Sequence, residues 1–400
     1  MTEQTAENET PEVFEPGRLG PLTLRNRIIK AATFEGRTPQ ALVSDELIEF
    51  HRRIAAGGVG MTTVAYCAVS PEGRTERRQI YMRSEAVPGL TRLAEAVHAE
   101  GAAVSGQIGH AGPVADARSN RLPALAASRR LSPLSGQMIQ EATGADLARL
   151  TQAHADAAEL LADSGFDAVE LHYGHNYLVS SFLSPRLNKR KDGWGGTLAG
   201  RARLARQIAE AVRARVGDRI AVTAKLSMDD GVRGGLTVED SLQIARMLQD
   251  DGHLDALQLT VGSSLMNPMY YFRGEAPVKE FAAVFPQPLR LGLRLGGRFF
   301  LKHYPYEPAY LLPHARRFRA ELDMPLILLG GITDRTTLDL AMAEGFQFAA
   351  MGRALLMEPD LPSRLREDAS VKSACIHCNR CMPTIYRGTR CVLAPEALPS

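Results

Sequence analysis

The run ELHYGHNYLVSSFLSP, residues 170–185, gathers side chains that exchange protons and hydrogen bonds at the point where a strand-like segment ends. His172 and His175 can hydrogen-bond a substrate oxygen, ligate a metal ion or serve as satisfied polar residues of a loop. Their spacing leaves these three interpretations open, although no acidic residue nearby completes a convincing zinc site. Tyr177 carries a hydroxyl group that can protonate a carbanion, but a tyrosine before an apolar run is more often a packing residue.

Lys225 lies near the end of another apolar run, IAVTAKLS at residues 220–227. A cation at this place can stabilise negative charge on a reduced flavin ring, or its amine can form a Schiff base with a carbonyl substrate. The sequence does not choose between these two roles. The apolar neighbours of this lysine argue against a surface position.

Four of the five cysteines lie near the end of the chain, at Cys375, Cys378, Cys381 and Cys391, in the spacing C-x2-C-x2-C-x9-C. Thiolates at such short spacing can hold one zinc ion or one iron–sulfur cluster, and His377 is a substitute ligand within the group. Reduced thiols without a metal are the alternative.

Eight strand-like apolar runs alternate with amphipathic, helix-like stretches. Continuous apolar runs are typical of parallel strands that are buried on both faces, so the alternation predicts an α/β protein with a (β/α)₈ TIM barrel. An open doubly wound sheet is the competing fold, but the first strand is not followed by the dinucleotide pattern GxGxxG. The predicted strands span residues 27–33, 60–66, 102–108, 167–172, 220–227, 255–261, 325–331 and 346–352.

Two connections, about 109–144 and 262–306, are too long for simple loops, and we expect both as insertions on the face where the strands end. Barrel active sites lie on that face, which adds weight to polar residues at strand ends. The segments LLGGIT (328–333) and AMGRALL (350–356) follow the last two strands. Glycines and a helix N-terminus there favour a phosphate, although tight turns alone would also explain them.

The composition limits the kinds of partner that this protein is expected to bind. A formal net charge of +2 over 400 residues is too small to suggest a nucleic acid or an anionic membrane, and no run of about 18 apolar residues is present to span a membrane. The acidic, polar N-terminus lacks the features of a signal peptide, and clustered cysteines suit a reducing compartment. We therefore expect a cytoplasmic protein that acts on a small molecule; a homo-oligomer is left open.

These motifs together resemble the old yellow enzyme family, the FMN-dependent ene-reductases and their NADH:flavin oxidoreductase relatives. The resemblance covers the chain from about Phe14 to Leu361. PLTLRNRIIKAAT looks like the first strand of the family, and GQIGHAG (106–112) looks like its third-strand motif. The most specific match is ELHYGHNYLVSSFLSPRLNKRKDGWGG, because the family carries E-L-H-x-x-H-x-Y-L, F-L-S-P, N-x-R and G-G there.

The resemblance implies three segments and a cofactor. Residues 1–13 would be a flexible lead-in, residues 14–367 the FMN-binding barrel and residues 368–400 a cysteine-rich extension. The cofactor-binding residues that it implies are Ala65 and Tyr66 through their backbone, Gln107, Lys225, Gly331, Gly352 and Arg353.

The resemblance also implies a reaction in two halves. NAD(P)H gives a hydride to FMN, and an α,β-unsaturated carbonyl compound, an activated alkene, then takes the hydride at its β-carbon. His172 and His175 would hold the carbonyl oxygen, and Tyr177 would protonate the α-carbon. Alternatives are an oxidative relative that acts on amines or alicyclic substrates, a flavin-free lyase that uses Lys225, and a binding protein whose metal knuckle recruits a partner.

Four features depart from the family pattern. Lys225 stands where arginine is usual, Phe34 where threonine or cysteine is frequent, and Pro113 where H-x-G-R has its arginine. The cysteine group resembles the [4Fe–4S] site of the dienoyl-CoA reductase and trimethylamine dehydrogenase branch, but its two later gaps are shorter. We therefore expect FMN and NAD(P)H, and at the cysteines a [4Fe–4S] cluster, zinc or free thiols.

Overall fold

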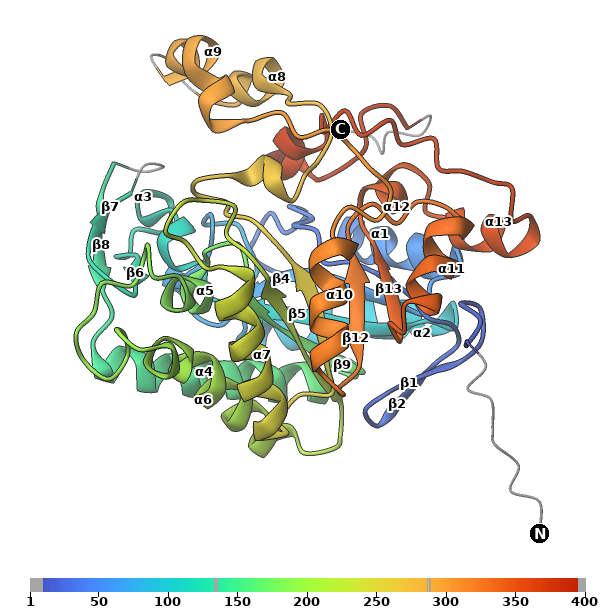
Figure 1. Ribbon diagram of the computed structural model, residues 1–400, viewed down its shortest axis with the longest axis horizontal. Helices are drawn as coiled ribbons and strands as arrows, with labels where there is room; N and C mark the ends of the chain where they lie inside the picture. Colours follow the sequence, from blue (N-terminus) through green and yellow to red (C-terminus); the bar gives the residue numbers. More distant parts are fainter. Residues whose placement is uncertain (1–9, 133–135, 286, 288, 395–400) are drawn as a thin grey trace.

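The predicted barrel is present in the computed structural model, which describes residues 10–132, 136–285, 287 and 289–394. Eight parallel strands close on themselves in the order β10-β11-β12-β13-β3-β4-β5-β9 (Figure 1). Each of the eight predicted runs overlaps one of these strands, so the (β/α)₈ prediction is confirmed. The strands are β3 (Ile28–Lys30), β4 (Met61–Ala68), β5 (Ala103–Gly109), β9 (Ala168–Tyr173), β10 (Ala221–Ser227), β11 (Ala256–Thr260), β12 (Leu326–Leu329) and β13 (Phe348–Met351).

Helices cover the outside of the barrel, and their ends carry the expected capping residues. Thr143 and Asp334 form capping boxes, and the side chain of Ser44 accepts a hydrogen bond from the backbone N–H of Leu47. The outer helices are α1 (Asp45–Ala56), α2 (Val87–Ala99), α4 (Gly144–Asp163), α6 (Leu198–Val216), α7 (Val238–Asp251), α10 (Leu312–Glu321), α11 (Arg335–Ala343), α12 (Arg353–Met357) and α13 (Leu361–Glu367).

A short hairpin of β1 (Gly17–Leu19) and β2 (Leu22–Leu24) lies at the end of the barrel where the strands begin (Figure 1). Leu19 and Leu24 pack there with residues from the barrel interior, such as Ile29, Met61 and Phe348. This apolar layer fills the lower half of the barrel, so polar chemistry is confined to the opposite end.

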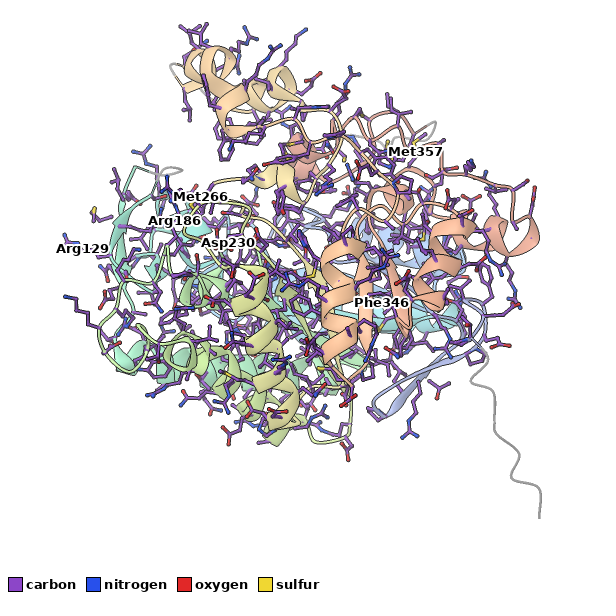
Figure 2. The ribbon with its side chains drawn as sticks, in the orientation of Figure 1. Arg129, Arg186, Asp230, Met266, Phe346 and Met357 are labelled. Carbon is purple, nitrogen blue, oxygen red and sulfur yellow. The ribbon has the colours of Figure 1, made fainter. Side chains whose placement is uncertain are left out.

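The other end of the barrel carries the two insertions and the C-terminal extension. The first insertion holds α3 (Ala117–Asn120), β6 (Leu125–Ala126), β7 (Arg130–Leu131) and β8 (Met138–Glu141), and the second holds α8 (Val278–Ala283) and α9 (Leu289–Phe300). A further short helix, α5 (Leu178–Leu183), follows β9. Figure 2 shows Asp230 and Met266, which follow β10 and β11, on this upper side, whereas Phe346, which precedes β13, lies lower.

The two ends of the chain are described only in part. Residues 1–9 of the predicted lead-in and residues 395–400 of the extension lie outside the described residues. Val13, the last residue of that lead-in, is buried against the main core. In the described part of the chain, no helix combines the length and apolar character needed to cross a membrane.

Candidate active site

The two histidines and Tyr177 come together above the barrel, as the sequence motif suggests. The ring of His172 lies 4.4 Å from the ring of Tyr177 and 5.3 Å from that of His175, measured between centroids. Two tyrosines that the motif analysis did not single out as catalytic complete the group. The ring of Tyr66, on β4, lies 5.4 Å from that of Tyr177, and the ring of Tyr271, in the second insertion, lies 4.5 Å from that of His175.

A tight turn after β9 orients the side chains of His175 and Tyr177. His175 and Asn176 both adopt left-handed backbone conformations, with φ of 60°. The turn is fixed by Asp230, a fully buried residue after β10, which accepts hydrogen bonds from the side chains of Asn176 at 2.9 Å and Ser184 at 2.5 Å. The backbone N–H of His175 also donates to Ser227 Oγ at 3.1 Å. Neighbouring strands therefore hold a conformation that the local sequence alone does not favour.

Both histidines are neutral at physiological pH. Burial, the neighbouring His175 and the charge of Lys225 hold the pKa of His172 well below its usual value, and burial with Lys225 lowers the pKa of His175 to about 3. A neutral imidazole offers one N–H donor and one acceptor. His175 Nε2 contacts Thr260 Oγ1 at 3.0 Å, whereas His172 Nδ1 is buried without a partner among the described residues. That nitrogen is available to a bound ligand.

A buried polar network lies beneath these rings, inside the barrel. Lys225 Nζ pairs with Glu170 Oε1 at 3.0 Å, and Gln107 Nε2 donates to the same oxygen at 2.7 Å. Gln258 donates to the other carboxylate oxygen. Strand register explains the contacts, because Gln107 lies beside Glu170 and Lys225 lies beside both His172 and Gln258. The predicted cofactor residues Gln107 and Lys225 therefore belong to one cluster.

The sequence analysis missed Glu170 and Gln258 as site residues. A signal for both was present, since each is a polar residue within an apolar strand. Side chains alternate along a strand, so Glu170 must share the inward face with His172, two positions later.

The glycines after β12 and β13 lie where a phosphate is expected. Gly331 has a φ of 79°, and a Cβ atom there would lie 2.8 Å from the backbone nitrogen of Ala309. A Cβ atom on Gly352 would meet nothing within 4 Å, so the space beside the start of α12 is open. Arg353 Nη1 donates to the carbonyl oxygen of Arg273 at 2.8 Å and to Asn379 Oδ1. A direct contact from Arg353 to phosphate stays a prediction.

These features fit a flavin mononucleotide. The unpaired nitrogen of His172, the unpaired Oε1 of Gln258 and the amide of Gln107 line the polar interior, and Lys225 supplies a buried cation. The open space at Gly352 suits the phosphate end. The backbone N–H of Ala65, predicted to lie near the ring, is hydrogen-bonded to Glu35 Oε2 at 2.8 Å.

The four cysteines of the extension line one small cavity together with Arg353, Met357 and Asn379. All are free thiols, and Cys391 Sγ lies 3.2 Å from Met357 Sδ. Burial raises the pKa of Cys381 to about 12. Among the residues that the structure describes, no group of three or more His, Cys, Asp or Glu side chains is placed to hold a metal ion. The structure therefore gives no support to the predicted iron–sulfur or zinc site.

Residues 12–263 match the model of the NADH:flavin oxidoreductase / NADH oxidase family. The chain belongs to this family. It is 55% identical over 384 residues to the 4,4'-dithiodibutanoate disulfide reductase of Rhodococcus erythropolis, which covers 96% of this chain and 95% of the relative. It spans about half the length of several other curated relatives. The family prediction is therefore confirmed, and the chain is an oxidoreductase.

Solved structures share the barrel fold of this chain. A 2-naphthoyl-CoA reductase in complex with 2-naphthoyl-CoA superimposes with a TM-score of 0.82 at 25% identity, over 96% of this chain and 57% of that one. The old yellow enzyme homologue from Zymomonas mobilis gives a TM-score of 0.72 at 22% identity, over 92% and 96% of the two chains. FMN and NAD(P)H both fit a member of this family.

Proposed function

We propose that this protein reduces the C=C bond of α,β-unsaturated carbonyl compounds at the expense of NAD(P)H. The observation that carries the proposal is the contact between His172 and Tyr177, whose ring centroids are 4.4 Å apart, with His175 beside them. Two neutral imidazoles and a phenol thus lie together, beside the buried cation of Lys225. When bound, FMN supplies the two-electron chemistry, taking a hydride from NAD(P)H and passing it to the substrate.

The residues of this chain act on the substrate oxygen and on the proton. His172 and His175 donate hydrogen bonds to the carbonyl oxygen, which becomes negative as the β-carbon accepts hydride. Donors that are fixed before the reaction stabilise this developing charge without reorganising. Tyr177 then delivers a proton to the α-carbon, which closes the balance of one hydride and one proton per alkene.

Reduction of an organic disulfide is the second candidate. The 55% identity to a 4,4'-dithiodibutanoate disulfide reductase over nearly both chains favours it. Two electrons and two protons convert one disulfide into two thiols, so NAD(P)H and solvent protons balance this reaction as well. Thiolates are stable leaving groups near neutral pH, because the pKa of a free thiol is about 8.5. This substrate therefore depends less on Tyr177 than an alkene does.

One anaerobic experiment tests both candidates. The FMN-loaded protein is reduced with one equivalent of NADH or NADPH and mixed with cyclohexenone or with 4,4'-dithiodibutanoate in separate runs, and a third sample is left oxidised and mixed with a secondary amine. The return of the oxidised flavin absorbance is followed. Rapid return with the enone supports the first proposal, and return only with the disulfide replaces it by the second. Bleaching of oxidised enzyme by the amine would instead establish the oxidative alternative.

Metal content and location remain separate proposals. That the four cysteines line one cavity is the observation in favour of a metal or cluster there. Iron and zinc analysis of protein purified without oxygen tests it, and the absence of both metals would leave four thiols. A cytoplasmic location also stays a prediction, and fractionation of cells that express a tagged chain tests it.

A further inference from the structure

A second buried ion pair lies beside the network of Lys225 and is not used in the proposed reaction. Lys30, the last residue of β3, is fully buried, and its Nζ lies 2.8 Å from Oε1 of Glu35. The same ammonium group donates to the carbonyl oxygen of Thr63 at 3.3 Å. A protein is often equally stable when apolar residues of similar volume replace a buried ion pair. Stability of the fold alone therefore does not explain why this pair is present.

Glu35 holds the backbone of Ala65 from both sides. Its Oε2 accepts the N–H of Ala65 at 2.8 Å, and its own backbone N–H donates to the carbonyl oxygen of Ala65 at 3.3 Å. Ala65 is followed by Tyr66, whose ring lies 5.4 Å from Tyr177 and 6.2 Å from His172. The carboxylate of Glu35 therefore fixes the segment that forms one wall of the active site.

Lys30 is the group that orients Glu35. The carboxylate has one oxygen on the ammonium group and the other on Ala65, so its two hydrogen bonds point in fixed directions. His51 lies on the same side, with Nε2 3.8 Å from Glu35 Oε1 and Nδ1 2.8 Å from Thr62 Oγ1. The ring of Phe50 closes the other side of the ammonium group, 5.1 Å from Nζ. His51 and Phe50 thus enclose the Lys30–Glu35 pair.

We propose that Lys30 and Glu35 are positioning residues of this oxidoreductase, which hold the segment Ala65–Tyr66 against the cofactor ring. The inference rests on the FMN chemistry of the family and does not depend on whether an alkene or a disulfide is the substrate. Lys30 orients Glu35, and Glu35 provides the acceptor for the N–H of Ala65. Neither residue touches substrate in this role.

Two double variants separate the hydrogen bond from the charge. Lys30→Met with Glu35→Gln removes both charges but keeps an amide oxygen for the N–H of Ala65. Lys30→Met with Glu35→Leu removes both charges and the acceptor. Replacing the complete pair avoids leaving one buried charge unpaired, which would unfold many proteins. Arg213→Met with Asp255→Leu is the control, because it removes a whole ion pair whose carboxylate also accepts a backbone N–H, that of Val222 at 2.7 Å, at the start of β10 and away from the site.

The readouts are the Kd for FMN, from quenching of flavin fluorescence, and the visible spectrum of the bound flavin. We expect the Glu35→Leu double variant to bind FMN about tenfold to a hundredfold more weakly with an altered spectrum, as loss of a charge-assisted hydrogen bond implies. The Glu35→Gln double variant should stay within about threefold of wild type, and the Arg213→Met with Asp255→Leu control should lower the melting temperature only.

Equal, wild-type Kd values and spectra in both double variants would show that the pair is merely structural. Equal weakening in both would show that charge, rather than the hydrogen bond to Ala65, matters. Either result overturns the proposal. Failure of the wild-type protein to bind FMN would instead contradict the assigned cofactor. If the leucine variant does not fold, the Lys30→Met with Glu35→Gln variant still tests the proposal. This variant keeps the acceptor for the N–H of Ala65, so a Kd for FMN raised tenfold or more would contradict the role of that acceptor.

Discussion

At the scale of single residues, protonation states decide what the active site can do. Burial and the charge of Lys225 keep His172 and His175 neutral, so each imidazole carries one N–H donor and one acceptor at physiological pH. Tyr177 lies against His172 and against Tyr66, which restricts its ring to the space above the barrel. The arrangement suits a substrate that gains negative charge on oxygen and needs one proton on carbon.

Tyr177→Phe should slow alkene reduction by about two to four orders of magnitude, the usual contribution of a positioned general acid. Reduction of the flavin by NAD(P)H should keep its rate, because that half-reaction needs no proton on carbon. Stopped-flow measurement of both halves checks this. Tyr173→Phe is the matched control, since the buried Tyr173 hydroxyl donates to the carbonyl oxygen of Ala205 at 2.8 Å, away from the site. Unchanged rates in Tyr177→Phe would refute the proton-donor role.

Replacing both His172 and His175 by alanine should abolish the binding of phenols, which mimic the enolate oxygen. Loss of one preorganised donor typically costs about 2.7–4 kcal/mol in the transition state. A phenol that stacks on the oxidised flavin gives a long-wavelength charge-transfer band, and titration of this band measures its Kd. A band of unchanged strength and midpoint in the double variant would exclude the pair as the oxygen clamp.

At the scale of elements, the C-terminal extension packs directly on the segment that holds Ala65. The backbone N–H of Thr389 donates to the carbonyl oxygen of Glu35 at 2.7 Å, and Arg37 Nη2 donates to the carbonyl oxygen of Thr389 at 3.2 Å. Gly36, between them, has a φ of 63°, and a Cβ atom there would lie 2.1 Å from the carbonyl oxygen of Ile385. The extension is therefore hydrogen-bonded directly to the segment that holds Ala65 in the active-site wall.

Gly36→Ala should displace the extension and weaken FMN binding. Gly252→Ala is the matched control, because Gly252 has a φ of 71° but a Cβ atom there meets nothing within 4 Å. Both variants bear the backbone strain of about 1–2 kcal/mol, and only Gly36→Ala adds the steric overlap. Limited proteolysis of the extension and the Kd for FMN provide the comparison. Equal protease resistance in the two variants would contradict a close contact at Gly36.

At the scale of the whole molecule, buried histidines make stability depend on pH. Burial lowers the pKa of His110 and of His154 to about 4, and that of His175, beside Lys225, to about 3. An unfolded histidine titrates near 6.5, so below that pH the unfolded chain binds more protons than the folded one. The contribution of these histidines to the free energy of unfolding is therefore complete above about pH 6.5 and is lost as the pH falls toward 4.

Each of these histidines should lower the free energy of unfolding by about 1.4 kcal/mol for every pH unit of acidification within that range. Denaturant unfolding at pH 7.5, 6.5, 5.5 and 4.5 measures the slope. His154→Gln should reduce it, because His154 lies on α4 away from the site and its Nδ1 meets the carbonyl oxygen of Leu150 at 2.7 Å. A stability that is flat between about pH 6.5 and 4.5 would contradict neutral, buried histidines.

The homo-oligomer stays a proposal, and helix α9 offers a surface for it. Leu291, Leu295 and Phe299 share its outer face and are 55%, 80% and 86% exposed, on the part of the chain that projects above the barrel (Figure 1). Leu295→Ser with Phe299→Ser should raise the dissociation constant of self-association at least about tenfold, since each apolar side chain contributes about 1.5–3 kcal/mol when buried. Sedimentation velocity measures it, with Leu131→Ser, 62% exposed on β7, as the control. A wild-type protein that stays monomeric at high concentration would refute the proposal.

The sequence by itself determined the barrel and indicated which polar side chains gather at one end of it. Continuous apolar runs can be buried on both faces only in a sheet covered by helices, so the eight strands were predictable from residue type. The motif around His172 and Tyr177 also predicted which strand end carries the reactive groups. Polar residues that interrupt such strands, namely Lys30, Glu170 and Gln258, were visible, but their partners were not.

Only the tertiary structure decided which of those polar residues meet. Glu170 lies beside Gln107 because of strand register, and Glu35 holds Ala65 because the chain folds back after β3. Contacts between residues far apart in sequence depend on closure of the barrel, which no local pattern encodes. The same holds for the four cysteines, whose spacing left an iron–sulfur cluster, zinc and free thiols open. Folding placed them around one cavity, but no group of three in the described chain is positioned for a metal ion.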